Sequence, residues 1–373
     1  MVSLPAVLVG AAFALVILLY ALLVHFSPRE TTPHPSEATY VTASSPTTAQ
    51  PLPSLLLLGR DAASKDRPTV ELSVVVPAYN ESNRIEVMLR SAVQFLEIRP
   101  VQDTSEGIEP AAGSYEILIV DDGSKDKTTE KVLEVAATLE TEVGAKRGEI
   151  RVCRLIRNRG KGGATRHGVL HSSGSRILFV DADGATRFED LALLEEEIEA
   201  VVSAQKSSSP SEAHGLVVGS RAHLVSTEAV VKRSALRNLL MRGFHLYLSL
   251  LGLSSIRDTQ CGFKLQTRST AQLLYPSLHS PGWIFDCELL LLAERCGVPL
   301  REVGVRWKEV PGSKLDVVKD SIRMARDLLV IRANYLVGRW KTPPRVDAGV
   351  SVTGDGIKVS GAATAPSESK KKR

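Results

Sequence analysis

The sequence predicts an α/β fold built around a mainly parallel, doubly wound sheet. Four short apolar runs have the length and composition of buried strands, at residues 72–76, 115–120, 150–155 and 177–180. Helical patterns separate these runs, and strands that alternate with helices form parallel sheets. Acidic or glycine-rich clusters follow the runs, and such sheets bind ligands beyond the carboxyl ends of their strands. We therefore expect one ligand site along that edge.

Residues 4–26, at the start of the chain, are uncharged and almost wholly apolar. A helix of this length, rising ~1.5 Å per residue, covers the ~30 Å hydrocarbon layer of a bilayer. Neither the basic start nor the cleavage site of a signal peptide is evident. We predict a retained transmembrane anchor that leaves residues 1–3 on the lumenal side. Basic residues after the span, beginning with Arg29, place the remainder in the cytosol.

Two segments of biased composition flank a domain predicted at residues 70–340. Residues 27–69 are rich in Pro, Ser and Thr, which is typical of a tether. Residues 341–373 are typical of a disordered basic tail. Its last four residues, Lys370 to Arg373, resemble a dilysine retrieval signal of the endoplasmic reticulum, although any solvated basic end has the same composition.

The composition sets limits on partners and compartment. A formal net charge of +4 and a pI near 8.8 are only mildly basic, and the tail supplies much of the excess, so no nucleic-acid role follows. The cysteines show neither CxxC spacing nor a disulfide-dense pattern; they are Cys153, Cys261, Cys287 and Cys296. We expect reduced thiols that face the cytosol.

Each predicted strand ends in a distinctive turn. Pro77 halts the first strand, because proline cannot donate to a sheet ladder, and a helix follows through residues 84–96. The second strand ends in Asp121, Asp122 and Gly123, before a helix expected at residues 128–139. The third strand leads into a glycine-rich loop and a helix that reaches His171.

The fourth strand runs directly into Asp181 and Asp183. Side chains alternate along a strand, so these two carboxylates point to the same side. Two hard oxygen ligands at a strand end suit Mg²⁺ or Mn²⁺ that also holds a diphosphate. The alternative is an ordinary strand-to-turn junction, where Asp and Gly are common.

Glycines at positions 160, 162 and 163 follow the third strand. They allow close backbone approach to an anion, and the helix after them offers free N–H groups. Lys161 adds a positive charge there. The pattern is neither a GxxxxGK[ST] loop nor a GxGxxG fingerprint after the first strand, which argues against a dehydrogenase. A flexible structural loop is the alternative.

Two later segments combine basic and apolar residues at helical spacing. One spans residues 230–253 and includes Arg233 and Arg237, and the other spans residues 317–340. Basic amphipathic helices lie at membrane interfaces and attract phosphate. The alternative is a pair of helices that pack on the sheet with solvated basic faces.

Taken together, these motifs resemble the inverting nucleotide-sugar glycosyltransferases, and within them the dolichyl-phosphate β-glucosyltransferases. The resemblance covers roughly residues 71–340. It rests on ordered motifs at residues 76–81, 120–124, 158–164, 181–183, 258–264, 282–289 and 312–315. It implies a nucleotide-sugar transferase fold with an N-terminal transmembrane helix and C-terminal amphipathic helices at the interface.

The resemblance also implies residue roles. The nucleotide-sugar site would comprise Pro77, Tyr79, Glu81, Asp122, Lys161, Gly162, Asp181 and Trp283. The catalytic residues would be Asp183, Asp286 and Gln260, with Asp181 and Asp183 holding the metal. The acceptor phosphate would meet Arg233, Arg237, Ser313 and Lys314. Mannose-transferring relatives carry Arg where this chain has Lys308, which leaves the phosphate clamp open.

Structural explanations remain open for several of these residues. Glu81 is also a residue that favours the start of a helix, because its charge complements the helix dipole. Asp122 is also common in ordinary turns, and Asp286 could cap the helix that follows it. Trp283 fits a core position, and Gln260 fits a buried amide.

The implied activity is transfer of glucose from UDP-glucose to dolichyl phosphate with inversion, for protein N-glycosylation at the endoplasmic reticulum membrane. UDP-glucose, dolichyl phosphate and the lipid bilayer are the expected partners, and no oligomeric state is predicted. One alternative is a polyprenyl-phosphate mannosyltransferase that uses GDP-mannose. Others are a processive polysaccharide synthase, which usually needs several spans, and an inactive membrane-anchored nucleotide-binding module.

Overall fold

The computed structural model describes most of the chain. Backbone and side chains are described for residues 4–29, 31–55, 68–99, 112–144, 147–205, 213–223, 256–312 and 316–346, apart from the side chains of residues 317 and 318. The backbone alone is described for residues 350–353 and 356–359.

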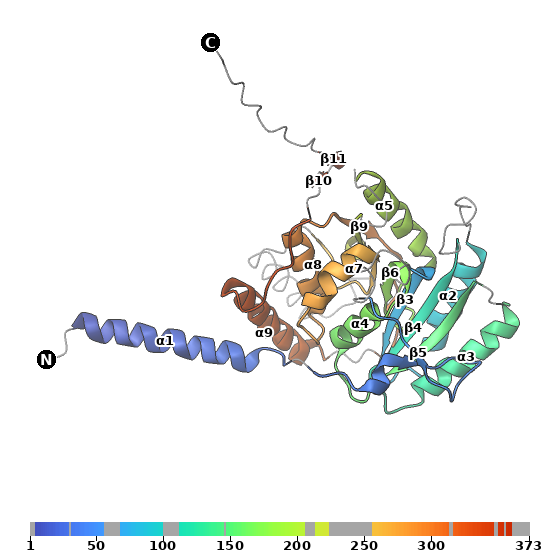
Figure 1. Cartoon of the computed structure of the whole chain (residues 1–373), viewed down its shortest axis with the longest axis horizontal. Coiled ribbons are helices and arrows are strands. Elements are labelled where there is room, and N and C mark those ends of the chain that lie inside the picture. Colours follow the sequence, from blue (N-terminus) through green and yellow to red (C-terminus); the bar gives the residue numbers. More distant parts are fainter. Residues whose placement is uncertain are drawn as a thin grey trace, which may run out of the picture.

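A seven-stranded sheet forms the centre of the molecule (Figure 1). Its spatial order is β5 (Gly148–Arg154), β4 (Tyr115–Asp121), β3 (Val70–Ala78), β6 (Gly174–Val180), β8 (Phe263–Thr267), β7 (Leu216–Ser220) and β9 (Leu300–Gly304). Parallel pairing joins β5, β4, β3 and β6, and also joins β7 to β9. Strand β8 is antiparallel to both its neighbours. The predicted mainly parallel α/β sheet is confirmed.

Strand β3 continues through Pro77, although the sequence predicts that it stops there. Pro77 pairs in register with Val120 of β4. On the other side, pairing with β6 ends at Val75 and Phe179. Beyond that point β3 has a neighbour on one side only, so a residue without an N–H group is tolerated.

Helices cover both faces of the sheet, and two buried apolar clusters fill the spaces between the layers. One face packs against α2 (Ile85–Ile98), α3 (Thr128–Glu142) and α5 (Leu191–Ser203). The other packs against α4 (Lys161–Leu170), α7 (Arg268–Leu274) and α8 (Phe285–Cys296). Alternation along β3 sends Val74 and Val76 to the first cluster and Val75 to the second. This strand is therefore apolar on both sides.

Residues 35–55, which we call the strap, are folded onto the domain, although residues 27–69 were expected to form a tether. The strap contains a 3₁₀ turn (Pro35–Ala38) and the strands β1 (Thr39–Tyr40) and β2 (Gln50–Pro51). Val41 bridges Val152 at the outer edge of β5. Leu55 is fully buried, and its N–H group donates to Leu170 O at 2.8 Å. Apolar burial and an ion pair described below hold a segment whose composition alone indicates a linker.

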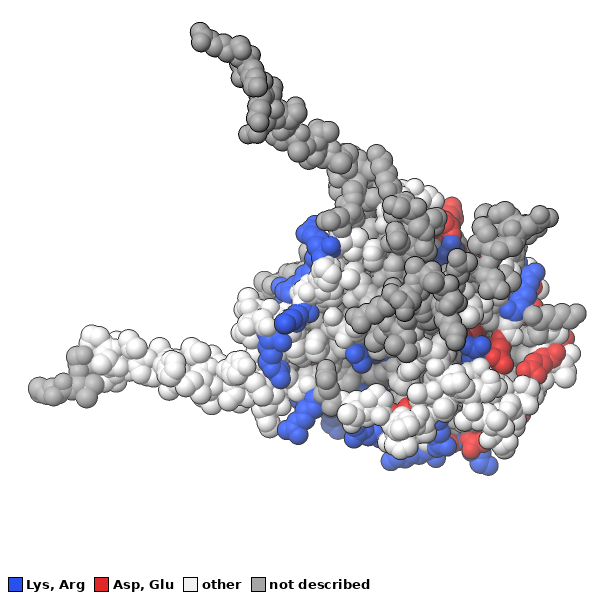
Figure 2. Space-filling model, viewed as in Figure 1, with Lys and Arg blue, Asp and Glu red and all other residues white. Residues whose placement is uncertain are grey.

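Helix α1 (Leu4–Phe26) projects from the domain (Figure 1). Its apolar side chains are exposed. Among the described residues it is the one helix long and apolar enough to cross a membrane. Its base is joined to α9 (Val317–Leu336), where Asn334 Nδ2 donates to Ser27 Oγ at 2.9 Å. Figure 2 shows Lys and Arg side chains near this junction.

Helix α9 is the second predicted amphipathic segment. Met324, Leu328 and Ile331 are buried against the domain, whereas Arg323 is exposed. The first predicted segment, residues 230–253, lies outside the described residues. Within the tail expected to be disordered, strands β10 (Val350–Thr353) and β11 (Gly356–Val359) pair as a hairpin.

Candidate active site

Asp181 and Asp183 follow β6 at the carboxyl edge of the sheet, as expected from their spacing. The Asp181 N–H group donates to Gly262 O at 3.1 Å, just before β8. A Cβ atom at position 262 would lie only 2.0 Å from Asp181 Oδ2. Any residue larger than glycine would therefore displace the carboxylate. Asp183 Oδ1 accepts a hydrogen bond from Ala185 N at 3.0 Å, which fixes the turn.

Lys161, the first residue of α4, pairs directly with this acidic turn. Its Nζ atom lies 2.7 Å from Asp181 Oδ1. The same atom lies 5.3 Å from the ring centroid of Phe179 and 5.5 Å from that of Trp283. Burial disfavours the charged ammonium, but Asp181 and Asp286 outweigh it and raise the Lys161 pKa. The site therefore holds a fixed positive charge against a strand-end carboxylate.

Arg84 provides a second positive charge, which the sequence analysis did not identify. Its Nε and Nη2 atoms donate to the two carboxylate oxygens of Glu81 at 2.8 and 2.7 Å. Its Nη1 atom lies 4.0 Å from Asp183 Oδ2 and 3.4 Å from Pro311 O. Arg84 thus links the start of α2 to the acidic turn and to the segment before Ser313.

The two carboxylates after β6 fit a divalent cation. Burial, followed by repulsion from Asp181, raises the Asp183 pKa. This repulsion indicates negative charge that a cation would relieve. The described residues contain no group of three or more His, Cys, Asp or Glu side chains arranged to hold a metal. Two carboxylates are nevertheless sufficient for Mg²⁺ or Mn²⁺, because phosphates and water usually complete the coordination of such ions.

Asp122 holds the glycine-rich loop in place. Its carboxylate accepts hydrogen bonds from Arg159 N at 2.7 Å and Gly160 N at 2.8 Å. Burial raises its pKa to about 7, even though these donors and the Arg159 charge oppose the shift. Gly160 has a φ of +86°, and a Cβ there would lie 2.5 Å from Pro281 O. This loop therefore requires glycine at its start.

The loop rests on the segment that leads into α8. Gly163 N donates to Pro281 O at 3.1 Å. A Cβ atom at Gly162 would lie 2.5 Å from Phe285 Cβ and 2.6 Å from Ser280 O. Close packing at position 162 brings α4 and Trp283 to the same end of the sheet.

A turn after β3 is pinned to the loop after β4. Asn80 has a φ of +53°, and its Oδ1 atom accepts from Lys125 N at 2.7 Å. Glu81 N donates to Thr128 Oγ1 at 2.8 Å. Pro77 and Tyr79 are half-buried beside this turn. Pro77, Tyr79 and Glu81, which were predicted to belong to the nucleotide-sugar site, thus lie together at the carboxyl end of β3, beside the loop after β4.

Asp286 lies in the first turn of α8 and is buried. Lys264 Nζ donates to Asp286 Oδ1 at 2.6 Å and to Cys261 O at 2.5 Å. Burial raises the Asp286 pKa, although Lys264 and Lys161 oppose the shift. Gln260 is half-buried one residue before Cys261. Lys264, like Arg84, is absent from the predicted site.

Comparisons with known proteins identify the family of the chain. The model of glycosyl transferase family 2 matches residues 73–206. A dolichyl-phosphate β-glucosyltransferase of Saccharomyces cerevisiae is 40% identical over 333 residues, covering 88% of this chain and 92% of the yeast protein. The chain belongs to the dolichyl-phosphate β-glucosyltransferase family. It is therefore a glycosyltransferase.

Other dolichyl-phosphate β-glucosyltransferases are similarly close. The Dictyostelium discoideum relative is 45% identical over 272 residues, which cover 73% of this chain and 77% of the relative. The human relative is 42% identical over 276 residues, which cover 74% of this chain and 79% of the human protein. Each comparison spans most of both chains, so the resemblance is not limited to residues 73–206, which match the family model.

Solved structures are more distant from this dolichyl-phosphate β-glucosyltransferase family member. A glucosyl-3-phosphoglycerate synthase from Mycobacterium tuberculosis in complex with uridine diphosphate is 18% identical, with a TM-score of 0.45, over 83% of this chain and 95% of that one. The same synthase in complex with Mn²⁺, UDP-glucose and phosphoglyceric acid is 19% identical, with a TM-score of 0.43. This match covers 76% of this chain and 83% of the synthase chain. Neither carries a residue role to this chain.

The structure brings most of the predicted donor site of this family member to one edge of the sheet. Asp181, Asp183 and Lys161 are in charge contact, and Gly162 and Trp283 adjoin them. The predicted acceptor-phosphate residues lie outside the described residues; they are Arg233, Arg237, Ser313 and Lys314. Arg84 was missed although it follows Glu81 by three residues, the spacing of a helical ion pair.

Proposed function

We propose that this chain transfers glucose from UDP-glucose to dolichyl phosphate with inversion, giving dolichyl β-D-glucosyl phosphate for protein N-glycosylation. Membership of the dolichyl-phosphate β-glucosyltransferase family supports this assignment. The structural observation that carries it is the contact of Lys161 with Asp181 at the carboxyl edge of the sheet. This arrangement combines an anion-binding helix start with a cation-binding strand end.

The donor diphosphate is proposed to lie between the glycine-rich loop and the acidic turn. Asp122 keeps the loop in position through the amides of Arg159 and Gly160, and Lys161 supplies positive charge. Asp181 and Asp183 are suited to hold Mg²⁺ or Mn²⁺, which would stabilise charge on the departing UDP. Pro77, Tyr79 and Glu81 are proposed to contact the nucleoside.

The acceptor chemistry requires little proton transfer. A phosphate monoester has a second pKa near ~6, so at pH 7 most of it is already dianionic. The main tasks of the protein are then positioning and charge stabilisation. Direct displacement at the anomeric carbon converts the α-linked donor to a β-linked product. Because Lys264 engages the buried Asp286 carboxylate, we assign Asp286 to orienting the site rather than to acting as a base. Gln260 and Trp283 are proposed to face the sugar.

The membrane location is part of the proposal. Helix α1 is proposed to anchor the chain in the endoplasmic reticulum membrane, with the catalytic domain in the cytosol. Exposed basic residues of α9 suit a membrane interface. Arg233, Arg237, Ser313 and Lys314 remain the proposed contacts of the acceptor phosphate.

A labelled-donor assay tests the proposal. Membranes that contain the full chain are incubated with labelled UDP-glucose or GDP-mannose, and lipid products are extracted. We expect glucolipid from UDP-glucose and no product from GDP-mannose. Mannolipid in place of glucolipid would refute the assignment of donor.

Asp183→Ala tests the metal assignment in the same assay. We expect transfer to fall to background, because one of two cation ligands is lost, while the melting temperature stays within a few degrees. Glu140→Ala, at an exposed position of α3, is the matched control and should retain full activity. Undiminished turnover by Asp183→Ala in chelator-treated buffer would contradict the metal assignment.

A further inference from the structure

A cleft of about 720 Å³ lies at the base of α1, away from the acidic turn. We call it the anchor cleft. It is lined by Ala21, Val24, His25, Ser27, Pro28, Arg29, His279, Arg339 and Trp340. The cleft therefore joins the last turns of the membrane helix to the C-terminal end of α9 and to the segment before α8.

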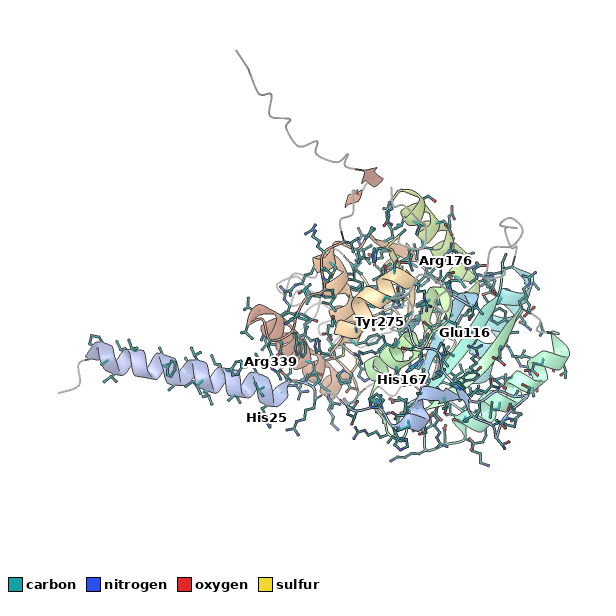
Figure 3. The ribbon with its side chains drawn as sticks, in the orientation of Figure 1. His25, Glu116, His167, Arg176, Tyr275 and Arg339 are labelled. Carbon is teal, nitrogen blue, oxygen red and sulfur yellow. The ribbon has the colours of Figure 1, made fainter. Side chains whose placement is uncertain are left out.

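The lining of the anchor cleft is apolar on the membrane side and basic toward the domain. Ala21 and Val24 come from the exposed apolar helix, whereas Arg29 and Arg339 are exposed cations beyond its end. No carboxylate is among the described residues that line the cleft. Figure 3 shows His25 and Arg339 at this junction, and Figure 2 shows Lys and Arg side chains gathered around it.

Contacts beneath the cleft hold it in shape. The rings of His279 and Trp340 are stacked, with centroids 4.1 Å apart and planes 4° from parallel. Buried Glu288 lies 3.2 Å from His279 Nδ1 and accepts a hydrogen bond from Tyr335 OH at 3.0 Å. These groups fix the aromatic wall.

The basic side of the cleft is also tied to the anchor. Arg339 Nη1 donates to Asn334 Oδ1 at 2.8 Å, and Asn334 Nδ2 donates to Ser27 Oγ at 2.9 Å. One amide therefore orients the arginine and joins α9 to the end of α1. The cleft is built into the junction rather than formed by loose surface side chains.

We propose that the anchor cleft binds the phosphate group of a membrane lipid. When α1 spans a bilayer, its apolar part ends at Phe26, which places Arg29 and Arg339 at the level of lipid phosphates. Arginine forms charge-assisted hydrogen bonds with phosphate oxygens, while the apolar wall accommodates the first part of a lipid chain. The acceptor lipid and an anionic phospholipid both supply this chemistry.

A short segment connects the cleft to the donor site. His279 lines the cleft, and the carbonyl oxygens of the next two residues, Ser280 and Pro281, abut the glycine-rich loop. Pro281 O accepts from Gly163 N, and Trp283 lies beside Lys161. The cleft would thus serve as a first holding site, which an acceptor leaves before its phosphate reaches the sugar at the contacts proposed above. The idea that an acceptor passes from the cleft to the donor site rests on the proposed function. Binding of a lipid phosphate in the cleft does not depend on that function.

Lipid retention tests the site directly. The full chain is reconstituted in phosphatidylcholine nanodiscs that contain dolichyl phosphate, phosphatidylinositol or unphosphorylated dolichol, and retained lipids are measured by native mass spectrometry. The test variant carries Arg29→Gln and Arg339→Gln. The control carries Arg187→Gln and Arg345→Gln, which remove the same charge at positions that do not line the cleft. We expect the wild type and control to retain a phosphorylated lipid, and the test variant to retain about tenfold less.

Kinetics identify the source of the phosphate. If dolichyl phosphate is the ligand, the test variant should show a KM for dolichyl phosphate raised about tenfold, with kcat and the KM for UDP-glucose unchanged. If a phospholipid is the ligand, only phosphatidylinositol retention falls. Equal retention by the two double variants, or retention of dolichol as strong as that of dolichyl phosphate, would overturn the inference. Absence of glucose transfer by the wild type would refute the proposed function and leave the retention result intact.

Discussion

Four charged side chains meet at the edge of the sheet. Lys161 and Arg84 face Asp181 and Asp183, at distances of 2.7 and 4.0 Å in the two closest pairs. The positions of Asp181, Asp183 and Lys161 could be predicted, because the two carboxylates follow one apolar run, Lys161 lies in the glycine-rich loop after another, and the carboxyl ends of parallel strands converge. Arg84 could not, because a helix turn and a long-range contact bring it to the site.

Lys264 is a second residue of the site that could not be predicted from the local sequence. It lies in β8, where apolar and polar residues alternate, yet its ammonium group is buried 2.6 Å from Asp286. The partner is 22 residues away, and the pairing depends on β8 running antiparallel to β6. The pattern of apolar and polar residues along β8 does not indicate whether the strand runs parallel or antiparallel to β6.

The raised pKa of Asp122 predicts a dependence of stability on pH. Its pKa is about 7 in the folded chain against 3.8 in the reference state, so the folded state holds the proton more tightly. The resulting contribution to stability is complete below pH 3.8 and is lost as the pH rises through about 7. The free energy of unfolding of the wild type, relative to Asp122→Asn, should therefore fall between pH 5 and pH 8.

Chemical unfolding of both proteins in detergent at four pH values measures this difference. Asp126→Asn serves as the control. Burial opposes ionisation of Asp126, but hydrogen bonds from Thr128 and Ser82 outweigh it and lower the pKa below 3.8. Its difference from the wild type should stay constant between pH 5 and pH 8. A constant difference for Asp122→Asn as well would contradict the raised pKa.

At the scale of elements, the strap supports the glycine-rich loop. Glu37 is fully buried, and its carboxylate accepts from His34 N and Ile156 N and pairs with Arg159. Arg159 in turn donates its N–H group to Asp122. A segment with the composition of a linker thus holds the loop that carries Lys161. Its role could not be predicted, because Pro, Ser and Thr signal neither strand nor helix.

Glu37→Gln should destabilise the fold and weaken donor binding. The change removes the charge that faces buried Arg159, at a cost of about 3 kcal/mol in the free energy of unfolding. Since Arg159 and Gly160 position the loop, the KM for UDP-glucose should also rise several-fold. Thermal melts and donor titrations measure the two effects, with exposed Glu140→Gln as the control. An unchanged melting temperature would show that the ion pair contributes nothing.

At the scale of the whole molecule, the strap sets the boundary of the folding unit. A chain that begins at residue 31 keeps Glu37 and Leu55, whereas one that begins at residue 68 uncovers the surface around Cys153 and His167. We expect the longer chain to be monodisperse and to melt cooperatively. The shorter chain should aggregate or melt at least several degrees lower. Size-exclusion chromatography and circular dichroism compare them, and equal behaviour would place the boundary after the strap.

The hydrogen bond between Asn334 and Ser27 also bears on how the domain would approach a lipid acceptor, because it connects α9 to the end of α1. Residues 27–34 separate the end of α1 from the strap, and the contact between Ser27 and Asn334 ties the end of α1 to α9. If α1 spans a bilayer as proposed, this contact would restrict how far the domain turns about the end of the helix. The rate at which such a domain meets a lipid acceptor would then depend on the density of that lipid in the plane of the membrane.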